Sequence, residues 1–240
     1  MMLLAIDAGN TRIKWGVRQE ENWAALGSVA VPEAPSLEPA WSYLPSDTAV
    51  IGSNVAGEGA RQIMEGILER RGLRVRWIAP RAQGFGITCR YDTAQLGSDR
   101  WAALVAARRL CPQSCLVVSS GTALTVDALT AQGEFLGGII VPGFDLMRTS
   151  LAGNTAALGL RDGRAEPFPR NTGDAIASGA IQALCGAVER MAGHMQTAGA
   201  PPALCLLSGG GAPLLEPHLR LPVRRVEHLA LEGLIVMARD

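Results

Sequence analysis

The feature that most constrains the fold of this sequence is a repeated plan of strands and turns. Residues 2–31 are predicted to form a strand, a glycine turn, a second strand, a polar turn and a third strand, and residues 115–142 follow the same plan. The recurrence of this antiparallel meander predicts an internally duplicated chain. In the two copies, the DAG segment at 7–9 aligns with the SSG segment at 119–121, and a threonine follows each glycine.

Strands and helices alternate in the remainder of each copy. Buried strands are predicted at 49–53, 75–78 and 204–207, and helices at 58–71, 99–110, 174–195 and 227–239. We therefore expect an α/β protein of two lobes, residues 1–112 and 113–240, with the ligand cleft between them. One alternative stays open, in which the last helix packs back on the first lobe.

The composition excludes several classes of protein. The 22 Lys and Arg residues balance the 22 Asp and Glu residues, so no broad cationic surface is available for nucleic acid or anionic lipid. The N-terminal residues lack the basic region of a signal peptide, and no apolar run approaches the ~18 residues of a membrane-spanning helix. Five cysteines without CxxC spacing and three scattered histidines predict neither a disulfide framework nor a zinc site. We expect a cytoplasmic protein without nucleic-acid or membrane partners.

The segment DAGNTRIK at residues 7–14 directly follows an apolar strand. Its glycine lets the backbone approach an anion, its backbone N–H groups and the Thr11 hydroxyl can donate to phosphate oxygens, and Asp7 can hold hydrated Mg²⁺. Lys14 is the only lysine in the sequence, and its ammonium would reach the same phosphates. The alternative interpretation is a β-turn with a solvated lysine.

A matching segment, GTALTVD at 121–127, opens the second copy, and two such turns could grip a polyphosphate from both sides. The alternative is a strand with one polar face. A third glycine segment, SGGG at 208–211, suits either a flat ligand or a plain strand-to-helix turn. The sequence contains neither GxGxxG nor GxxxxGK[ST], which argues against a Rossmann or Walker site.

The predicted helix at 99–110 is preceded by Gly97 and Ser98, with Ser98 placed to cap it. Asp99 in the first turn suits a helix N-terminus for purely structural reasons. Next to a phosphate donor, however, an ionised Asp99 can orient and deprotonate an alcohol, and Arg100 can bind a carboxylate with two hydrogen bonds. Tyr91 either lines the same pocket or packs in the core.

Taken together and in order, these segments resemble the type III pantothenate kinases, also known as Bvg accessory factor proteins, of the acetate and sugar kinase/Hsc70/actin superfamily. The resemblance covers nearly the whole chain. The segments that carry it are DAGNTRIK at 7–14, QLGSDRW at 95–101, SGTALTVD at 120–127, GGIIVPGFDLM at 137–147, NTGDAI at 171–176 and SGGGA at 208–212.

The resemblance implies a fold of two ribonuclease-H-like lobes and transfer of the ATP γ-phosphoryl group to pantothenate, the first step towards coenzyme A. It implies that Asp99 is the general base and that Asp7 also serves the metal of Mg-ATP. The ATP-binding residues that it implies are Asp7, Ala8, Gly9, Asn10, Thr11, Arg12, Ile13, Lys14 and Thr122. The implied pantothenate contacts are Tyr91, Gly97, Ser98, Asp99, Arg100 and Thr172, the last from the partner subunit of a homodimer.

The sequence departs from the family pattern at Ser119, where many members have an aspartate that helps to bind K⁺ or NH₄⁺. A serine hydroxyl supplies no counter-charge, so we expect activity to depend little on a monovalent cation. Two other functions stay open: a non-catalytic regulatory protein on the same scaffold, and a kinase of another small alcohol such as a sugar. The presence of Asp7, Lys14 and Asp99 favours a kinase. A site with one Asp and one Arg favours a substrate with one alcohol and one carboxylate.

Overall fold

The computed structural model describes residues 2–155, 158–159 and 161–240. The chain forms two compact units, Met1–Leu110 with His228–Asp240 and Cys111–Glu227. The division after residue 110 lies two residues before the boundary expected at Pro112. The structure groups residues 228–240 with the first unit rather than with the second lobe, because the C-terminal helix packs on a helix of the first unit.

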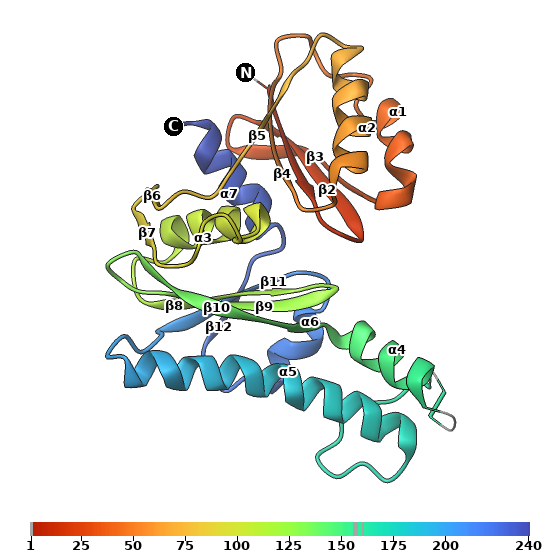
Figure 1. The fold of residues 1–240 in the computed structure, drawn as a ribbon, viewed down its shortest axis with the longest axis vertical. Coiled ribbons are helices and arrows are strands. Elements are labelled where there is room, and N and C mark those ends of the chain that lie inside the picture. The colour runs from red at the N-terminus through yellow and green to blue at the C-terminus, as the bar shows by residue number, and fades with distance from the viewer. Residues whose placement is uncertain (1, 156–157, 160) are drawn as a thin grey trace. The chain divides into compact units, whose positions relative to one another are not determined.

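The first unit, coloured red to yellow-green and, at its C-terminal residues, blue in Figure 1, is built on a sheet whose strand order is β3-β2-β1-β4-β5. The pairs β1–β2 and β2–β3 are antiparallel, whereas β1–β4 and β4–β5 are parallel. The strands are β1 Met2–Ala8, β2 Arg12–Gln19, β3 Asn22–Ala30, β4 Ala49–Asn54 and β5 Val75–Trp77. The expected meander at 2–31 is thus confirmed.

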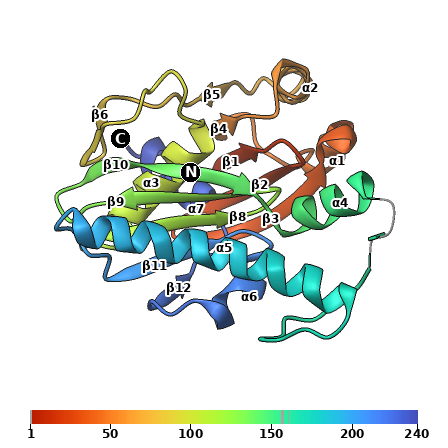
Figure 2. The ribbon, with the colours of Figure 1, turned by 60° about the horizontal axis from the view of Figure 1, so that its bottom comes forward.

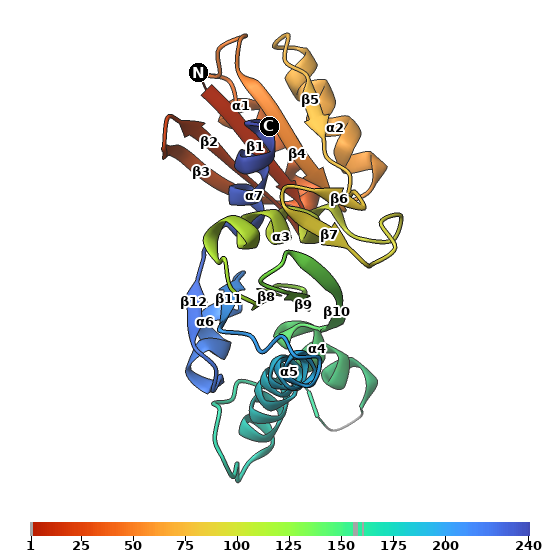
Figure 3. The same cartoon turned by 90° about the vertical axis from the view of Figure 1, so that its left-hand side faces the viewer.

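Helices border the sheet of the first unit. They are η1 Val31–Ser36, α1 Leu37–Ala40, α2 Glu58–Glu69, α3 Ser98–Leu110 and α7 Leu229–Ala238, and a short hairpin is formed by β6 Gln83–Gly84 and β7 Ile87–Cys89. Leu4, Ile6 and Ala8 of β1 pack in one core with Trp41 and Met64. Because successive strand side chains point to opposite faces, Asp7 lies on the other face of the sheet. Helices α3 and α7 pack together, and α7 also contacts β1 and β4 (Figure 3).

The second unit contains the strands β10-β9-β8-β11-β12 in that order. Its strands are β8 Cys115–Ser120, β9 Ala123–Leu129, β10 Glu134–Pro142, β11 Leu204–Ser208 and β12 Val223–Arg225. Its helices are α4 Phe144–Asn154, α5 Thr172–Thr197, α6 Ala212–Leu215 and η2 Glu216–His218. The long helix α5 lies along the sheet and contacts β8 and β9 (Figure 2). Its apolar side chains Ile181, Leu184 and Val188 share a core with Leu116 and Val118.

The two units have the same topology, which confirms the duplication expected from the sequence. In each unit a three-stranded antiparallel meander is extended at its first strand by two parallel strands. Asp7 and Ser119 occupy equivalent positions, since each is the second-last residue of the first strand. Asp7 pairs with Lys14 on one side and Ser53 on the other, and Ser119 pairs with Thr125 and Ser208.

The described helices include no segment whose length and hydropathy would let it span a lipid bilayer.

Candidate active site

The turn between β1 and β2 presents backbone and polar groups at one end of the first sheet. The amide of Gly9 donates to the carbonyl of Arg12 at 3.0 Å, which closes the turn. Asn10 and Thr11 at its tip are exposed. The guanidinium of Arg12 binds back to β3, where its Nε donates to the Ser28 hydroxyl at 2.8 Å. The tip of the turn is therefore accessible, which a loop that binds phosphate through its N–H groups requires.

Two residues of the expected phosphate loop have side chains in the hydrophobic core. Ala8 and Ile13 are fully buried and paired across β1 and β2. Their side chains belong to the core beneath the turn. Any contact that they make with a ligand must therefore come from their backbone groups.

Asp7 lies where burial and charge oppose each other. Its Oδ1 is buried and has no hydrogen-bond partner among the described residues. Burial, the largest effect, raises the pKa of Asp7, the charge of Lys14 lowers it and the charge of Asp99 raises it, so that the pKa is raised overall from 3.8 to about 6. A buried carboxylate oxygen without a donor carries a desolvation penalty that a cation would relieve.

A hydrogen bond between two serines brings helix α3 to Asp7. Ser53 pairs with Asp7 across the parallel strands β1 and β4, and its side chain is fully buried. The hydroxyls of Ser53 and Ser98 are 2.9 Å apart, and Ser98 is the first residue of α3. Ser53 thus fixes the start of α3 beside the end of β1. Ser53 was not singled out from the sequence, and the only signal for it was its position at the end of a predicted buried strand.

The expected capping role of Ser98 is wrong. The helix begins at Ser98 itself, and its hydroxyl is engaged with Ser53 and with the carbonyl of Asn54 at 3.5 Å. The start of the helix instead requires a residue without a side chain at 97, because a Cβ on Gly97 would overlap Oδ1 of Asp99. Oδ1 of Asp99 accepts a hydrogen bond from the amide of Arg100 at 2.8 Å. Glycine at 97 therefore makes room for the Asp99 carboxylate.

Arg100 and Tyr91 are neighbours in the first unit. The guanidinium carbon of Arg100 lies 5.1 Å from the centre of the Tyr91 ring. Arg100 is only 6% exposed, which is unusual for an arginine. The stacking fixes the direction of the guanidinium through a cation–π contact. The sequence left Tyr91 open between pocket and packing, and the structure places it against Arg100.

Three glycine-containing segments of the second unit meet at the end of β8. The amide of Gly121 donates to the carbonyl of Ala123 at 3.0 Å, and the amide of Gly143 donates to the carbonyl of Thr122 at 2.8 Å. A Cβ on Gly209, whose φ is +95°, would overlap the carbonyl oxygen of Ser120. Thr122 is exposed at this end of the sheet.

Thr172 is the first residue of α5. The side chain of Asn171 caps this helix by accepting from the amide of Asp174 at 2.9 Å. Thr172 also lines a groove of about 1160 Å³ between α4 and α5, together with Leu146, Met147 and Leu151. Thr122 and Thr172 belong to the second unit, whereas the remaining expected site residues belong to the first.

Comparisons with known proteins identify the family of this chain. The family model of type III pantothenate kinases matches residues 3–194. A type III pantothenate kinase of Aromatoleum aromaticum is 50% identical over 240 residues, which cover 100% of this chain and 98% of that protein. Another from Azoarcus sp. is 47% identical over 240 residues, covering 99% and 90%.

Solved structures share the fold at low sequence identity. A Campylobacter jejuni protein assigned to the Baf family of transcriptional activators has a TM-score of 0.63 and 16% identity over 98% of this chain and 97% of its own. A Sinorhizobium meliloti protein assigned as a 2-dehydro-3-deoxygalactonokinase has a TM-score of 0.64 and 18% identity over 99% and 98%. The sequence and family matches are the stronger finding, and they place this chain in the type III pantothenate kinase family, the enzymes that phosphorylate pantothenate on the route to coenzyme A.

Proposed function

We propose that the β1–β2 turn and the first turn of α3 carry out the reaction of this pantothenate kinase. In that reaction the γ-phosphoryl group of ATP is transferred to the primary hydroxyl of pantothenate. The oxygen–phosphorus bond to the pantothenate hydroxyl forms, the bond to the ADP oxygen breaks, and the hydroxyl proton passes to Asp99. Phosphoryl transfer asks chiefly for positioning and charge neutralisation, which a loop and a helix terminus can supply.

One observation carries this proposal: the charged side chains of Lys14 and Asp99 both lie close enough to Asp7, at the end of β1, for their charges to act on its carboxylate. Lys14 is the cross-strand partner of Asp7, and the charges of Lys14 and Asp99 both act on the Asp7 carboxylate. A cation and two carboxylates are the groups needed to hold a metal-bound phosphate, stabilise the moving phosphoryl group and accept a proton. The β1–β4 register and the Ser53–Ser98 hydrogen bond keep them together.

The divalent ion of Mg-ATP fits the residues present. Oδ1 of Asp7 is buried without a hydrogen-bond donor among the described side chains, and a carboxylate oxygen is a ligand that Mg²⁺ prefers. Asp7 would hold the ion, with water and ATP phosphate oxygens completing its coordination. When bound, Mg²⁺ neutralises charge on those phosphate oxygens.

The residues of the turn divide into two groups in this proposal. Asn10, Thr11 and Arg12 present backbone or side-chain donors to the phosphates, and Gly9 closes the turn without a side chain in their way. Ala8 and Ile13 hold the turn on the core. Lys14 stabilises charge on the transferred group. Thr122, in the equivalent turn of the second unit, contacts ATP from that unit.

Pantothenate carries an alcohol at one end and a carboxylate at the other, and α3 presents a group for each. Asp99 aligns the alcohol and accepts its proton, and Arg100 pairs with the carboxylate. Tyr91 orients Arg100 through its ring. Gly97 and Ser98 shape the turn, and Thr172 contributes from the partner subunit of a homodimer.

The homodimer and the cytoplasmic location belong to the same proposal. The groove between α4 and α5 is lined mainly by apolar side chains, and Leu146 and Leu151 are 45% and 42% exposed. A second copy of the chain covering this groove would bury those side chains. It would also bring Thr172 of one subunit to the pantothenate site of the other. Size-exclusion chromatography with light scattering measures the molar mass of the protein in solution. A monomer at micromolar concentration would contradict the proposed dimer.

The proposed role of Asp99 is tested by Asp99→Asn. We expect the variant to fold and to lose activity by about 10²-fold or more in kcat, since positioning and proton transfer are both impaired. Circular dichroism and the melting temperature check the fold. Loss of stability with full specific activity would instead assign Asp99 to stabilising the helix N-terminus.

A further inference from the structure

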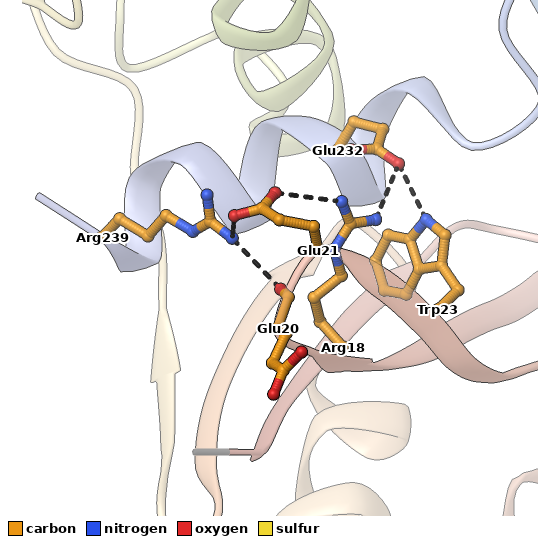
Figure 4. A network of polar contacts seen from close by, with 6 residues as sticks. All are labelled: Arg18, Glu20, Glu21, Trp23, Glu232 and Arg239. Carbon is orange, nitrogen blue, oxygen red and sulfur yellow. Dashed lines mark hydrogen bonds and ion pairs between the residues drawn. The ribbon is translucent and has the colours of Figure 1, made fainter.

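The C-terminal helix α7 is tied to the meander of the first unit by a network of polar side chains (Figure 4). Glu232 of α7 accepts a hydrogen bond from Trp23 Nε1 at 2.7 Å and lies 3.5 Å from Arg18. The guanidinium of Arg18 also stacks 5.0 Å from the centre of the Trp23 ring. Near the end of the chain, Arg239 lies 3.0 Å from Glu21 in the β2–β3 turn.

A second attachment joins the end of α7 to β5, the edge strand opposite β3 in the same sheet. Arg76 of β5 donates from Nη2 to the carbonyl of Met237 at 2.6 Å. This carbonyl lies in the last turn of α7, where helix carbonyls have no partner within the helix. The helix is therefore fixed at both β2–β3 and β5.

The face of α7 between these attachments lies against the first turns of α3. Gly233 is buried, and a Cβ at this position would overlap the carbonyl oxygen of Ala102 and lie 2.6 Å from its carbonyl carbon. The atoms that it would meet belong to the backbone and cannot rotate away. Gly233 is not among the residues with positive φ, so its value lies in the close approach of the two helices and not in its backbone conformation.

Ala102 is three residues after Asp99, which places it one turn further along α3 on the same side of the helix. A side chain on Gly233 must therefore push apart α7 and the part of α3 that carries Asp99. The polar attachments leave α7 little freedom to retreat. Displacement would fall on the start of α3, which is joined to the sheet through the hydroxyls of Ser53 and Ser98.

We propose that Gly233 is a positioning residue for Asp99: it lets the anchored helix α7 seat directly on the Ala102 carbonyl and so fixes the first turn of α3 against the sheet. The proposal rests on the proposed role of Asp99. Gly233 touches neither substrate, and its effect is transmitted through the backbone of α3.

The kinetic consequence distinguishes positioning from general stability. A misplacement of a reacting group by ~1 Å can cost about 10²-fold in rate. We expect Gly233→Ala to lower kcat by at least about tenfold and to raise the KM for pantothenate, because Arg100 moves with Asp99. The KM for ATP should stay within about twofold, because the phosphate-binding turn belongs to β1 and β2.

The matched control is Gly66→Ala in α2. Gly66 is also inside a helix of the first unit, but a Cβ there would make only an ordinary contact, 3.6 Å from Nη1 of Arg70. This variant should keep all kinetic constants of the wild type. Wild-type kcat in Gly233→Ala, with Asp99→Asn inactive, would overturn the positioning role and leave the role of Asp99 intact. Wild-type kcat in Asp99→Asn would overturn the role of Asp99 and with it the positioning through Asp99.

A second pair of variants decides the matter if Gly233→Ala does not fold. Glu232→Ala removes the attachment of α7 to Trp23 and Arg18 without adding bulk, and it should lower kcat with an unchanged KM for ATP. Glu232→Gln keeps an oxygen for the Trp23 indole and should restore most of kcat. Equal, wild-type kcat in both variants would contradict the proposal, as would a fall in the melting temperature with no change in kcat.

Discussion

At the scale of single residues, Asp7 has a carboxylate whose burial costs folding free energy and whose proposed role is to hold a metal ion. One oxygen of its carboxylate is buried although the residue as a whole is partly exposed, and its pKa is raised to about 6, chiefly by this burial. The folded protein without metal therefore binds a proton at Asp7 more readily than the unfolded chain does. A cation held by the same oxygen would remove the cost, which links metal binding to stability.

The sign of this effect can be measured with Asp7→Asn in metal-free protein. Because the folded state has the higher pKa, lowering the pH from about 6 towards 3.8 stabilises the wild type. Raising the pH through the same range destabilises it. Asparagine does not titrate, so at about pH 8 the variant should be more stable than the wild type. The shift from 3.8 to about 6 corresponds to about 3 kcal/mol as an upper value, because the side chain is only half-buried.

Thermal or urea unfolding at several pH values checks this prediction. The advantage of Asp7→Asn should shrink as the pH is lowered towards 4. An Asp7→Asn variant that is less stable than the wild type at pH 8 would show that the carboxylate is well solvated or paired in the folded protein. Activity of the variant should be lost at every pH, because Asn binds Mg²⁺ poorly.

At the scale of secondary-structure elements, glycines mark where backbones must nearly touch. Gly209 has a φ of +95°, and a Cβ there would overlap the Ser120 carbonyl oxygen, whereas Gly210 has open space around it. Gly209→Ala should therefore destabilise the protein by about 2 kcal/mol or more, and Gly210→Ala by less than about 0.5 kcal/mol. Urea unfolding of the two variants gives the comparison, and equal stabilities would contradict the packing of this turn on β8.

The meanders, the parallel strands and helices α2, α3, α5 and α7 could be predicted because their apolar periodicity is local. Helix α4, which has no buried residue, was not predicted. The DAGNTRIK turn and the GSDR start of α3 were also predicted from local sequence. In the first segment a glycine and polar residues directly follow an apolar strand, and in the second they precede a run of helix-forming residues. The cap at Ser98 was predicted wrongly because its hydroxyl is taken by Ser53, 45 residues earlier. The short elements β6, β7, α6 and η2 span two to four residues, too few to show a period.

At the scale of the whole molecule, the duplication gives Asp7 of the first unit an equivalent position in the second unit, which is occupied by a serine. Asp7 and Ser119 hold equivalent positions in equivalent strands. The placement of α7 with the first unit could not be predicted from periodicity, because it depends on contacts between distant parts of the chain. One is the close approach of Gly233 to Ala102. The others are hydrogen bonds from Arg76 to Met237, 161 residues apart, and from Trp23 to Glu232, 209 residues apart.

The serine at 119 predicts a weak response to monovalent cations. A neutral hydroxyl cannot provide the counter-charge that a partly dehydrated K⁺ or NH₄⁺ needs. Activity with Mg-ATP and pantothenate should be nearly the same with Na⁺, K⁺, NH₄⁺ or a bulky organic cation at equal ionic strength. Strong, saturable activation by K⁺ or NH₄⁺ alone would contradict this interpretation of Ser119.

The most direct test of the proposed reaction site is ATP-dependent phosphorylation measured with pantothenate and, separately, with a panel of sugars. ADP release is followed in a coupled assay, and mass spectrometry identifies the phosphorylated product. We expect turnover with pantothenate, little turnover with any sugar, and loss of turnover in Asp99→Asn while Gly66→Ala remains fully active. Equal turnover with a sugar, or phosphopantothenate formed by Asp99→Asn at the wild-type rate, would contradict it.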